Sequence, residues 1–262
     1  MNRNQDKLKK IAIVTGASGG IGKAFVEQLM KEDLEEIWII GRNQERLHEI
    51  RENYGEKIIC LCKDLTDRQD LLSMRDLLQH QQVCVSYLIN NAGIAQMKPS
   101  LDFDITEIEQ TIKLNCQVLV ILCHECIPFM TKGSHILNLS SASAFQPVPY
   151  INLYASTKAF EKSYSQALHE ELKYLGISVT AVCPSWVDTK MLMREINGKQ
   201  VHFPGIVSPQ KVDKKALKDA KKGKNISICS FYVKCQYLNV KFMPQNWIMK
   251  YWMNSLKKYK SN

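Results

Sequence analysis

The stretch IAIVTGASGGIG, residues 11–22, joins a short apolar run to a glycine-rich turn. The run at 11–15 is apolar almost throughout, as in a strand buried on both faces of a parallel sheet. Gly16, Gly20 and Gly22 permit a tight turn, close approach of the backbone to a pyrophosphate and close packing of the next helix. The N-terminus of that helix would face the phosphates. The stretch therefore predicts the opening strand, turn and helix of a dinucleotide-binding fold.

The rest of the chain alternates short apolar runs with longer amphipathic segments. We expect further strands at 36–41, 57–62, 85–90, 135–140, 177–183 and 226–229. We expect helices near 21–32, 43–53, 66–80, 104–131, 154–175 and 208–222. Apolar strands separated by helices indicate an α/β fold with a doubly wound parallel sheet of the Rossmann type. We expect one domain over 1–262, with a substrate loop or lid at 185–207 and a basic C-terminal extension at 208–262.

Composition limits the class of protein. The 262 residues are 45% apolar, which suffices for a substantial core. The polar start MNRNQDKLKK precedes a run too short for a signal peptide, and no uninterrupted apolar stretch approaches the about 18 residues of a spanning helix. Nine cysteines without framework spacing indicate reduced thiols. We expect a cytoplasmic protein without a metal site, because CLC (60–62) and CHEC (123–126) fall in a predicted strand and helix.

A second signal lies in NLYASTKAFEKSY, residues 152–164, which sets Tyr154 and Lys158 one helical turn apart. Alone, such a pair is typical of a surface or dimer-facing helix. Four further motifs accompany it, at spacings that match one known family: NNAG at 90–93, IKLNCQV around Asn115, NLSSAS with Ser141 thirteen residues before Tyr154, and CPSWVDT at 183–189. With the spacing G-x-x-x-G-x-G, the chain to about residue 190 resembles the short-chain dehydrogenase/reductase family, classical type.

This resemblance implies a catalytic tetrad of Asn115, Ser141, Tyr154 and Lys158. In the reduction direction, Tyr154 would donate a proton to the carbonyl oxygen while Ser141 orients that oxygen. Lys158 would bind the nicotinamide ribose, and its ammonium would favour the phenolate form of the tyrosine. Asn115, in a locally distorted helix, would anchor a water that resupplies Lys158. Ser185 and Ala144 stand where the family often has glycine, which affects only the loops near the nicotinamide.

The resemblance also implies a set of cofactor contacts. The positions concerned are Gly16, Ser18, Gly20, Ile21, Gly22, Arg42, Asn43, Asp64, Leu65, Asn91, Ala92, Gly93, Tyr154, Lys158, Pro184, Val187 and Thr189. An NAD site needs a carboxylate where the second strand ends, whereas Arg42 stands there, so NADP(H) is favoured over NAD(H). The alternative is a solvated Arg42 in an enzyme of dual specificity. Asp64 would contact the adenine amino group, although a simple helix N-cap would look the same.

The substrate is predicted from apolar residues near the tetrad and in the loop. These are Ile94, Met97, Phe145, Val148, Tyr150, Met191, Leu192, Met193, Ile196, Val201 and Phe203. They favour a lipophilic ketone or secondary alcohol such as a hydroxysteroid or bile acid. The alternatives are a 3-oxoacyl (fatty-acyl) reductase, a broad carbonyl reductase and, from another class, an NADP(H)-sensing protein on the same fold. Retention of all four tetrad positions argues against the sensor.

Basic charge is concentrated at the end of the chain. Residues 1–198 carry a net charge of −3 and residues 199–262 a net charge of +12. In the tail 242–262 we expect the apolar side to pack over the substrate cleft or a partner subunit, with the lysines in water. The alternatives are an interfacial helix on anionic lipid and a basic site for an acidic carrier such as coenzyme A. Nucleic acid is the least favoured partner. The resemblance implies a homodimer or homotetramer built through the helices at 104–131 and 154–175.

Overall fold

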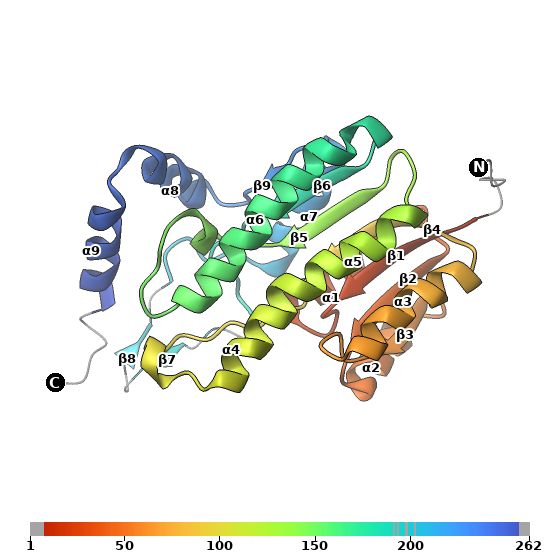
Figure 1. Cartoon of the computed structure of the whole chain (residues 1–262), viewed down its shortest axis with the longest axis horizontal. Coiled ribbons are helices and arrows are strands. Elements are labelled where there is room, and N and C mark those ends of the chain that lie inside the picture. Colours follow the sequence, from red (N-terminus) through yellow and green to blue (C-terminus); the bar gives the residue numbers. More distant parts are fainter. Residues whose placement is uncertain (1–7, 191, 193, 197–198, 202, 257–262) are drawn as a thin grey trace.

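The central strand of the fold is β1 (Lys9–Thr15), which pairs in parallel with β2 (Glu36–Gly41) on one side and β4 (Val83–Asn90) on the other. The computed structural model describes residues 8–190, 192, 194–196, 199–201 and 203–256. Its main sheet has seven parallel strands in the order β3-β2-β1-β4-β5-β6-β9 (Figure 1). The other strands are β2 (Glu36–Gly41), β3 (Ile58–Cys62), β4 (Val83–Asn90), β5 (His135–Leu139), β6 (Ser178–Val182) and β9 (Ile226–Ser227). The predicted strands and the Rossmann-type fold class are confirmed.

Alternate residues of the strands form a separate core on each face of the sheet. The helices that cover it are α1 (Gly20–Leu29), α2 (Gln44–Tyr54), α3 (Arg68–His80), α4 (Ile105–Ile112), α5 (Leu119–Cys126), α6 (Asn152–Leu172) and α7 (Pro209–Lys221). On one face, Ala12 and Val14 pack with apolar residues of α1, α2 and α7. On the other, Ile11 and Ile13 pack with residues of α3, α5 and α6. Both faces are covered, which explains why the strands are apolar throughout.

Local sequence signals set where several helices begin. Asp104 and Glu107 form a reciprocal capping box at α4. The Asp67 carboxylate accepts hydrogen bonds from two backbone amides at the start of α3. At α7, Pro209 occupies the first turn, and within the described part of the chain the Ser208 side chain makes no capping bond. The predicted helix at 104–131 is interrupted by a π-helical segment, Lys113–Val118, and this interruption bears on the site.

The helical stretch Ile105–Phe129 is long and apolar enough, by length and composition, to cross a membrane. The sequence analysis considered only uninterrupted apolar runs, and this stretch, which polar and charged residues interrupt, did not enter it. In the structure Leu119, Leu122 and Cys123 of this stretch are buried in the core against the sheet. Within the ranges that the structure describes, no three His, Cys, Asp or Glu side chains gather to hold a metal ion.

The C-terminal part adds elements that the sequence prediction did not specify. A short antiparallel hairpin joins β7 (Glu195–Ile196) to β8 (Lys199–Gln200). Helices α8 (Phe231–Phe242) and α9 (Gln245–Leu256) form an arm at one end of the molecule, drawn in blue (Figure 1). The Tyr237 ring lies 4.6 Å from the Phe145 ring, and Trp252 Nε1 donates a 2.9 Å hydrogen bond to the Pro149 carbonyl. The arm therefore packs on the segment that follows Ser141.

Candidate active site

The glycine turn after β1 is closed tightly by its own backbone. Gly16 has φ +62°, a conformation that favours glycine. A Cβ on Gly22 would lie 2.3 Å from the Gly16 carbonyl oxygen, so only glycine fits there. Within the described structure, no side chain caps the start of α1. The amides of its first turn are thus available to an anion, which is the arrangement expected of a pyrophosphate site.

The Thr15 hydroxyl ties this turn to the loop after β4. Its Oγ1 accepts hydrogen bonds from the amides of Asn91 (2.9 Å) and Ala92 (3.0 Å) and donates to the Ile89 carbonyl (3.4 Å). Asn91 completes the connection, because its Nδ2 donates to the carbonyls of Thr15 and Gly16. The one donor and two acceptor positions of this buried hydroxyl are thereby satisfied. The NNAG motif holds the glycine turn in place.

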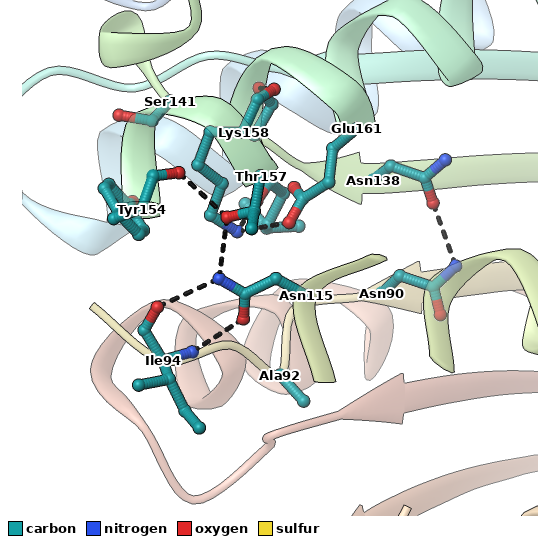
Figure 2. Close-up of polar contacts among 12 residues, drawn as sticks. Asn90, Ala92, Ile94, Asn115, Asn138, Ser141, Tyr154, Thr157, Lys158 and Glu161 are labelled. Atoms are coloured by element: carbon teal, nitrogen blue, oxygen red, sulfur yellow. Dashed lines mark hydrogen bonds and ion pairs between the residues drawn. The ribbon is translucent and has the colours of Figure 1, made fainter. Parts of the chain in front are cut away.

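Hydrogen bonds between buried asparagine side chains join β4 and β5 to α6. Asn90 Nδ2 donates to Asn138 Oδ1 at 2.9 Å, and Asn138 Nδ2 donates to Ser165 Oγ at 2.9 Å. Figure 2 shows the two asparagines facing each other across β4 and β5. These polar side chains stand in an apolar interior, and their mutual bonds offset the cost of burying them.

Asn115 lies in the π-helical segment, as the resemblance led us to expect of its helix. Its side chain is 1% exposed and fully engaged. Oδ1 accepts from the Ile94 amide at 2.8 Å, and Nδ2 donates to the Ile94 carbonyl and to Thr157 Oγ1, both at 2.9 Å (Figure 2). The side chain therefore positions the loop after β4. Its predicted role as a water anchor stays a prediction.

Lys158 is buried below Tyr154, on the same face of α6. The Lys158 Nζ lies 5.5 Å from the centroid of the tyrosine ring. It donates a 2.7 Å hydrogen bond to the Leu139 carbonyl. It donates another, also of 2.7 Å, to Glu161 Oε1 (Figure 2). A Cβ on Gly93 would lie 3.3 Å from Asn115 Oδ1 and 3.4 Å from this ammonium. The structure thus brings together Tyr154, Lys158 and Asn115 beside the NNAG loop.

Glu161 is a residue of this site that the sequence analysis missed. It lies one turn after Lys158, and the i, i+3 spacing of a lysine and a glutamate was the available signal. Burial raises the pKa of Glu161 to about 7, against the attraction of the Lys158 ammonium. Burial, the largest single influence, tends to lower the pKa of Lys158, but Glu161, Tyr154 and Cys116 together outweigh it and the pKa is raised.

Ser141 opens the short turn Ala142–Phe145 that packs against α6. Its hydroxyl is half-buried and accepts a 3.1 Å hydrogen bond from the Ser143 amide. Figure 2 shows Ser141 and Tyr154 on the same side of Lys158. The preceding Ser140 is buried and donates to the Lys158 carbonyl at 2.7 Å. The serine pair thereby links the end of β5 to the tyrosine helix.

The residues expected near the adenosine end lie around the end of β2. Arg42 is exposed there, and Asn43 caps α2 by accepting the Arg46 amide at 2.8 Å. Asp64 accepts from the amide and hydroxyl of Thr66, so the alternative that it caps the next helix is wrong. Burial tends to raise the pKa of Asp64, but the hydrogen bonds from Thr66 hold it below its usual value. Leu65 is buried in the core.

The last motif, residues 183–189, closes over the glycine turn. The Pro184 carbonyl accepts the Ala142 amide at 2.9 Å, and Val187 forms a β-bridge with Val207. A Cβ on Gly20 would lie 2.5 Å from Thr189 Cγ2. The exposed Ser18 and half-buried Ile21 lie in the same turn region.

The described residues of the expected apolar wall come from three segments of the chain. Phe145 and Val148 follow Ser141 on one segment, and Val148 is buried. Tyr150 has φ +68°. Its backbone carbonyl accepts a hydrogen bond from the Lys98 amide, which connects that segment to the loop of Ile94 and Met97. Leu192, Val201 and Phe203 are half-buried, and Phe203 packs against Trp186 at 5.1 Å. Met191, Met193 and the side chain of Ile196 lie outside the described residues.

These features fit a bound dinucleotide. The glycine turn exposes its backbone, the start of α1 presents amides that no described side chain caps, and the exposed Arg42 follows the end of β2. The Lys158 ammonium and the Tyr154 phenol lie beyond the turn, at the carboxyl ends of β4 and β5. The arrangement suits hydride transfer with proton donation from the phenol.

Comparison with known families and curated proteins gives the same picture. Residues 10–200 match the family model for short chain dehydrogenases. The chain is 36% identical over 193 residues to a very-long-chain 3-oxoacyl-CoA reductase of Rattus norvegicus, covering 71% of this chain and 62% of that protein. It therefore spans less than two thirds of the length of this relative. It is also 30% identical over 185 residues to an uncharacterized oxidoreductase of Staphylococcus epidermidis, of which it covers 80%.

Solved structures resemble the whole chain. A short-chain dehydrogenase from Sphingobium yanoikuyae in complex with NADPH has a TM-score of 0.75 and 25% identity, covering 97% of this chain and 98% of that one. The bulky-bulky ketone specific alcohol dehydrogenase of Comamonas testosteroni has a TM-score of 0.71 at 23% identity, covering 97% of both chains. The second similarity bears on the fold alone.

Replacing Thr15 by valine should destabilise the protein while conserving shape. Thr15→Val leaves the amides of Asn91 and Ala92 without their acceptor, and each unmade bond costs about 1–3 kcal/mol. We expect the free energy of unfolding in urea to fall by about 2–4 kcal/mol. Thr106→Val, at an exposed position of α4, is the matched control and should change stability by less than about 0.5 kcal/mol. Equal stability of the two variants would contradict the assigned role.

Proposed function

The chain belongs to the short-chain dehydrogenase family, and from that membership we propose that it is an NADP(H)-dependent oxidoreductase interconverting a secondary alcohol and a ketone on a lipophilic substrate. The observation that carries the proposal is the buried Lys158 ammonium 5.5 Å from the Tyr154 ring, beside Asn115 and the NNAG loop. A non-catalytic sensor on the same fold could use the ammonium to hold a ribose but would have no need of the Tyr154 phenol beside it.

Each residue of the tetrad has a part in the proposed reaction. When bound, the nicotinamide supplies or accepts the hydride. In reduction, the Tyr154 hydroxyl donates its proton to the substrate oxygen, and the Ser141 hydroxyl donates a hydrogen bond that orients this oxygen. The Lys158 ammonium holds the ribose and favours the phenolate that is left. Asn115 fixes the loop of Ile94, which borders the reacting centre.

For the substrate, we now favour a 3-oxoacyl thioester over a hydroxysteroid. A curated relative at 36% identity is named a very-long-chain 3-oxoacyl-CoA reductase. The apolar residues Phe145 and Val148 suit an acyl chain, and the net charge of +12 over residues 199–262 suits an acidic carrier such as coenzyme A. A hydroxysteroid, a bile acid or a broad range of carbonyl compounds remain the alternative substrates.

The C-terminal arm has a place in this proposal. Its contacts with Phe145 and Pro149 support a role as a cover on the substrate side, while Lys234, Lys241 and Lys250 are exposed to water. We propose a cytoplasmic homodimer or homotetramer whose interface is formed by the helices at 104–131 and 154–175. In favour of this assembly, Phe160 of α6 is exposed and stacks on Tyr164.

Loss of the phenol tests the reaction itself. We expect Tyr154→Phe to lower turnover at least about a hundredfold, because the proton donor is gone, while NADPH binding is retained. The measurement is nicotinamide absorbance across 3-oxoacyl and 3-hydroxyacyl thioesters, hydroxysteroids, bile acids and simple secondary alcohols. Normal turnover by the variant would sink the mechanism. Silence of the wild type across the panel, with tight NADPH binding, would favour the sensor.

Arg42 tests the choice of cofactor. Removing a guanidinium from a phosphate should raise KM for NADP⁺ about tenfold or more in Arg42→Ala and leave KM for NAD⁺ nearly unchanged. Arg51→Ala is the matched control, because Arg51 pairs with Glu56 at the other end of α2. If Arg42→Ala affects both cofactors equally, the arginine is a solvated loop residue and the NADP(H) preference is withdrawn.

The arm is tested by two tryptophans of one helix. Trp252→Ala should raise KM for the lipophilic substrate severalfold, whereas Trp247→Ala, at a 63% exposed position, should not.

Co-sedimentation of the full chain and of a chain ending at residue 241 with anionic liposomes tests the membrane alternative. We expect equal partitioning. Stronger sedimentation of the full chain would make the arm a membrane contact.

A further inference from the structure

Glu161 is a buried carboxylate that the mechanism above does not use. It is 1% exposed on α6, and its Oε1 accepts the Lys158 ammonium at 2.7 Å. Its Oε2 is buried and has no hydrogen-bond partner among the described residues. Burying a carboxylate with one oxygen unpaired is costly, so this ion pair is not explained by stability.

The pair restricts what Lys158 can offer to a ligand. An ammonium has three donors. Two of them go to the Leu139 carbonyl and to Glu161, each at 2.7 Å, which leaves one for the ribose and tyrosine side. The carboxylate thus fixes where the ammonium lies and which way its remaining proton is available.

Few other charges reach this pair. The titratable groups that face it are Tyr154 on the same helix, Cys116 from the π-helical segment and Cys183 after β6, with Lys162 next along α6. Burial raises the pKa of Cys116 to about 11 and that of Cys183 to about 12, so both thiols are neutral at ordinary pH. The charge that Tyr154 experiences therefore depends mainly on Lys158 and Glu161.

We propose that Glu161 is a positioning residue for the Tyr154 proton transfer: it holds the Lys158 ammonium on the Leu139 carbonyl and offsets its charge, which sets the pH range in which Tyr154 exchanges its proton. The proposal rests on the function proposed above. Glu161 acts through Lys158, whose ammonium its Oε1 contacts at 2.7 Å.

The sign of the effect follows from charge. With Glu161 ionised, the pair is neutral and Lys158 favours the phenolate weakly. With Glu161 protonated or replaced by glutamine, the ammonium is unbalanced and favours the phenolate strongly. Since burial raises the pKa of Glu161 to about 7, this change occurs near neutral pH in the wild type.

The test measures the ionisation of Tyr154 without cofactor or substrate. Phenolate absorbance is titrated in the wild type and in Glu161→Gln, and the Tyr154→Phe version of each is subtracted. We expect the Tyr154 transition in Glu161→Gln to move to lower pH by about one unit. The pH midpoint of alcohol oxidation should move in the same direction. Glu125→Gln is the matched control and should move neither, because Glu125 is another buried glutamate, on α5, whose Oε2 makes no hydrogen bond within the described residues and pairs with Arg75 at 3.6 Å.

A second variant separates charge from shape. Glu161→Asp keeps the negative charge and should keep a transition close to that of the wild type. If Glu161→Gln does not fold, Glu161→Asp and infrared spectroscopy carry the test. In the wild type the band of the protonated Glu161 carboxyl should titrate near neutral pH. This band should be missing at the same position in Glu161→Asp. An unmoved transition in Glu161→Gln, or equal shifts in the glutamine and aspartate variants, would overturn the proposal.

The outcome also separates this proposal from the proposed function. A shifted phenolate transition in a protein that turns over no substrate of the panel would support Glu161 and count against the enzyme assignment. Turnover with an unmoved transition would support the enzyme and remove Glu161 from its mechanism.

Discussion

The carboxyl edge of the sheet depends on one buried hydroxyl. Seven parallel strands end at this edge and leave backbone groups that neither strand nor helix can pair. Thr15 Oγ1 satisfies two amides of the loop after β4 and contacts the Ile89 carbonyl, while Asn91 returns two bonds to the turn. The glycine turn and the NNAG loop are therefore one unit. The cofactor side of the site is built from backbone held in place by side chains.

The substrate side is held by buried polar groups of a different kind. Asn115 grips the loop of Ile94 from within a π-helical segment, and Lys158 reaches the end of β5. A buried ammonium needs a counter-charge, and in this chain Glu161 provides it from the same helix. The proposed proton transfer uses the positive charge, and the Glu161 carboxylate offsets it. The pair is close to neutral above the pH at which Glu161 titrates and carries a net positive charge below it.

The local sequence pattern sufficed to predict the elements that local residues determine. Strands were predictable because burial on both faces makes them apolar throughout, and the π-helical distortion at Asn115 was implied by family resemblance. Glu161 was missed because the spacing of Lys158 and Glu161 does not reveal that both side chains are buried. The cap that Asn43 provides to α2 and the antiparallel hairpin β7–β8 also escaped prediction. The arm of α8 and α9 depends on tertiary contacts with Phe145 and Pro149.

The residues proposed for proton transfer lie in one part of this chain, whereas the residues proposed to contact the substrate come from both sides of residue 200. The family match ends at residue 200, and every tetrad residue precedes that point. The segments that pack beside the substrate side, Val207 against Val187 and the arm against Phe145, come after it. A reaction centre fixed by buried hydrogen bonds tolerates little change, whereas an arm that contacts it through one ring pair and one carbonyl can vary without disturbing the sheet. Substrate choice can therefore differ among proteins that share the same proton chemistry.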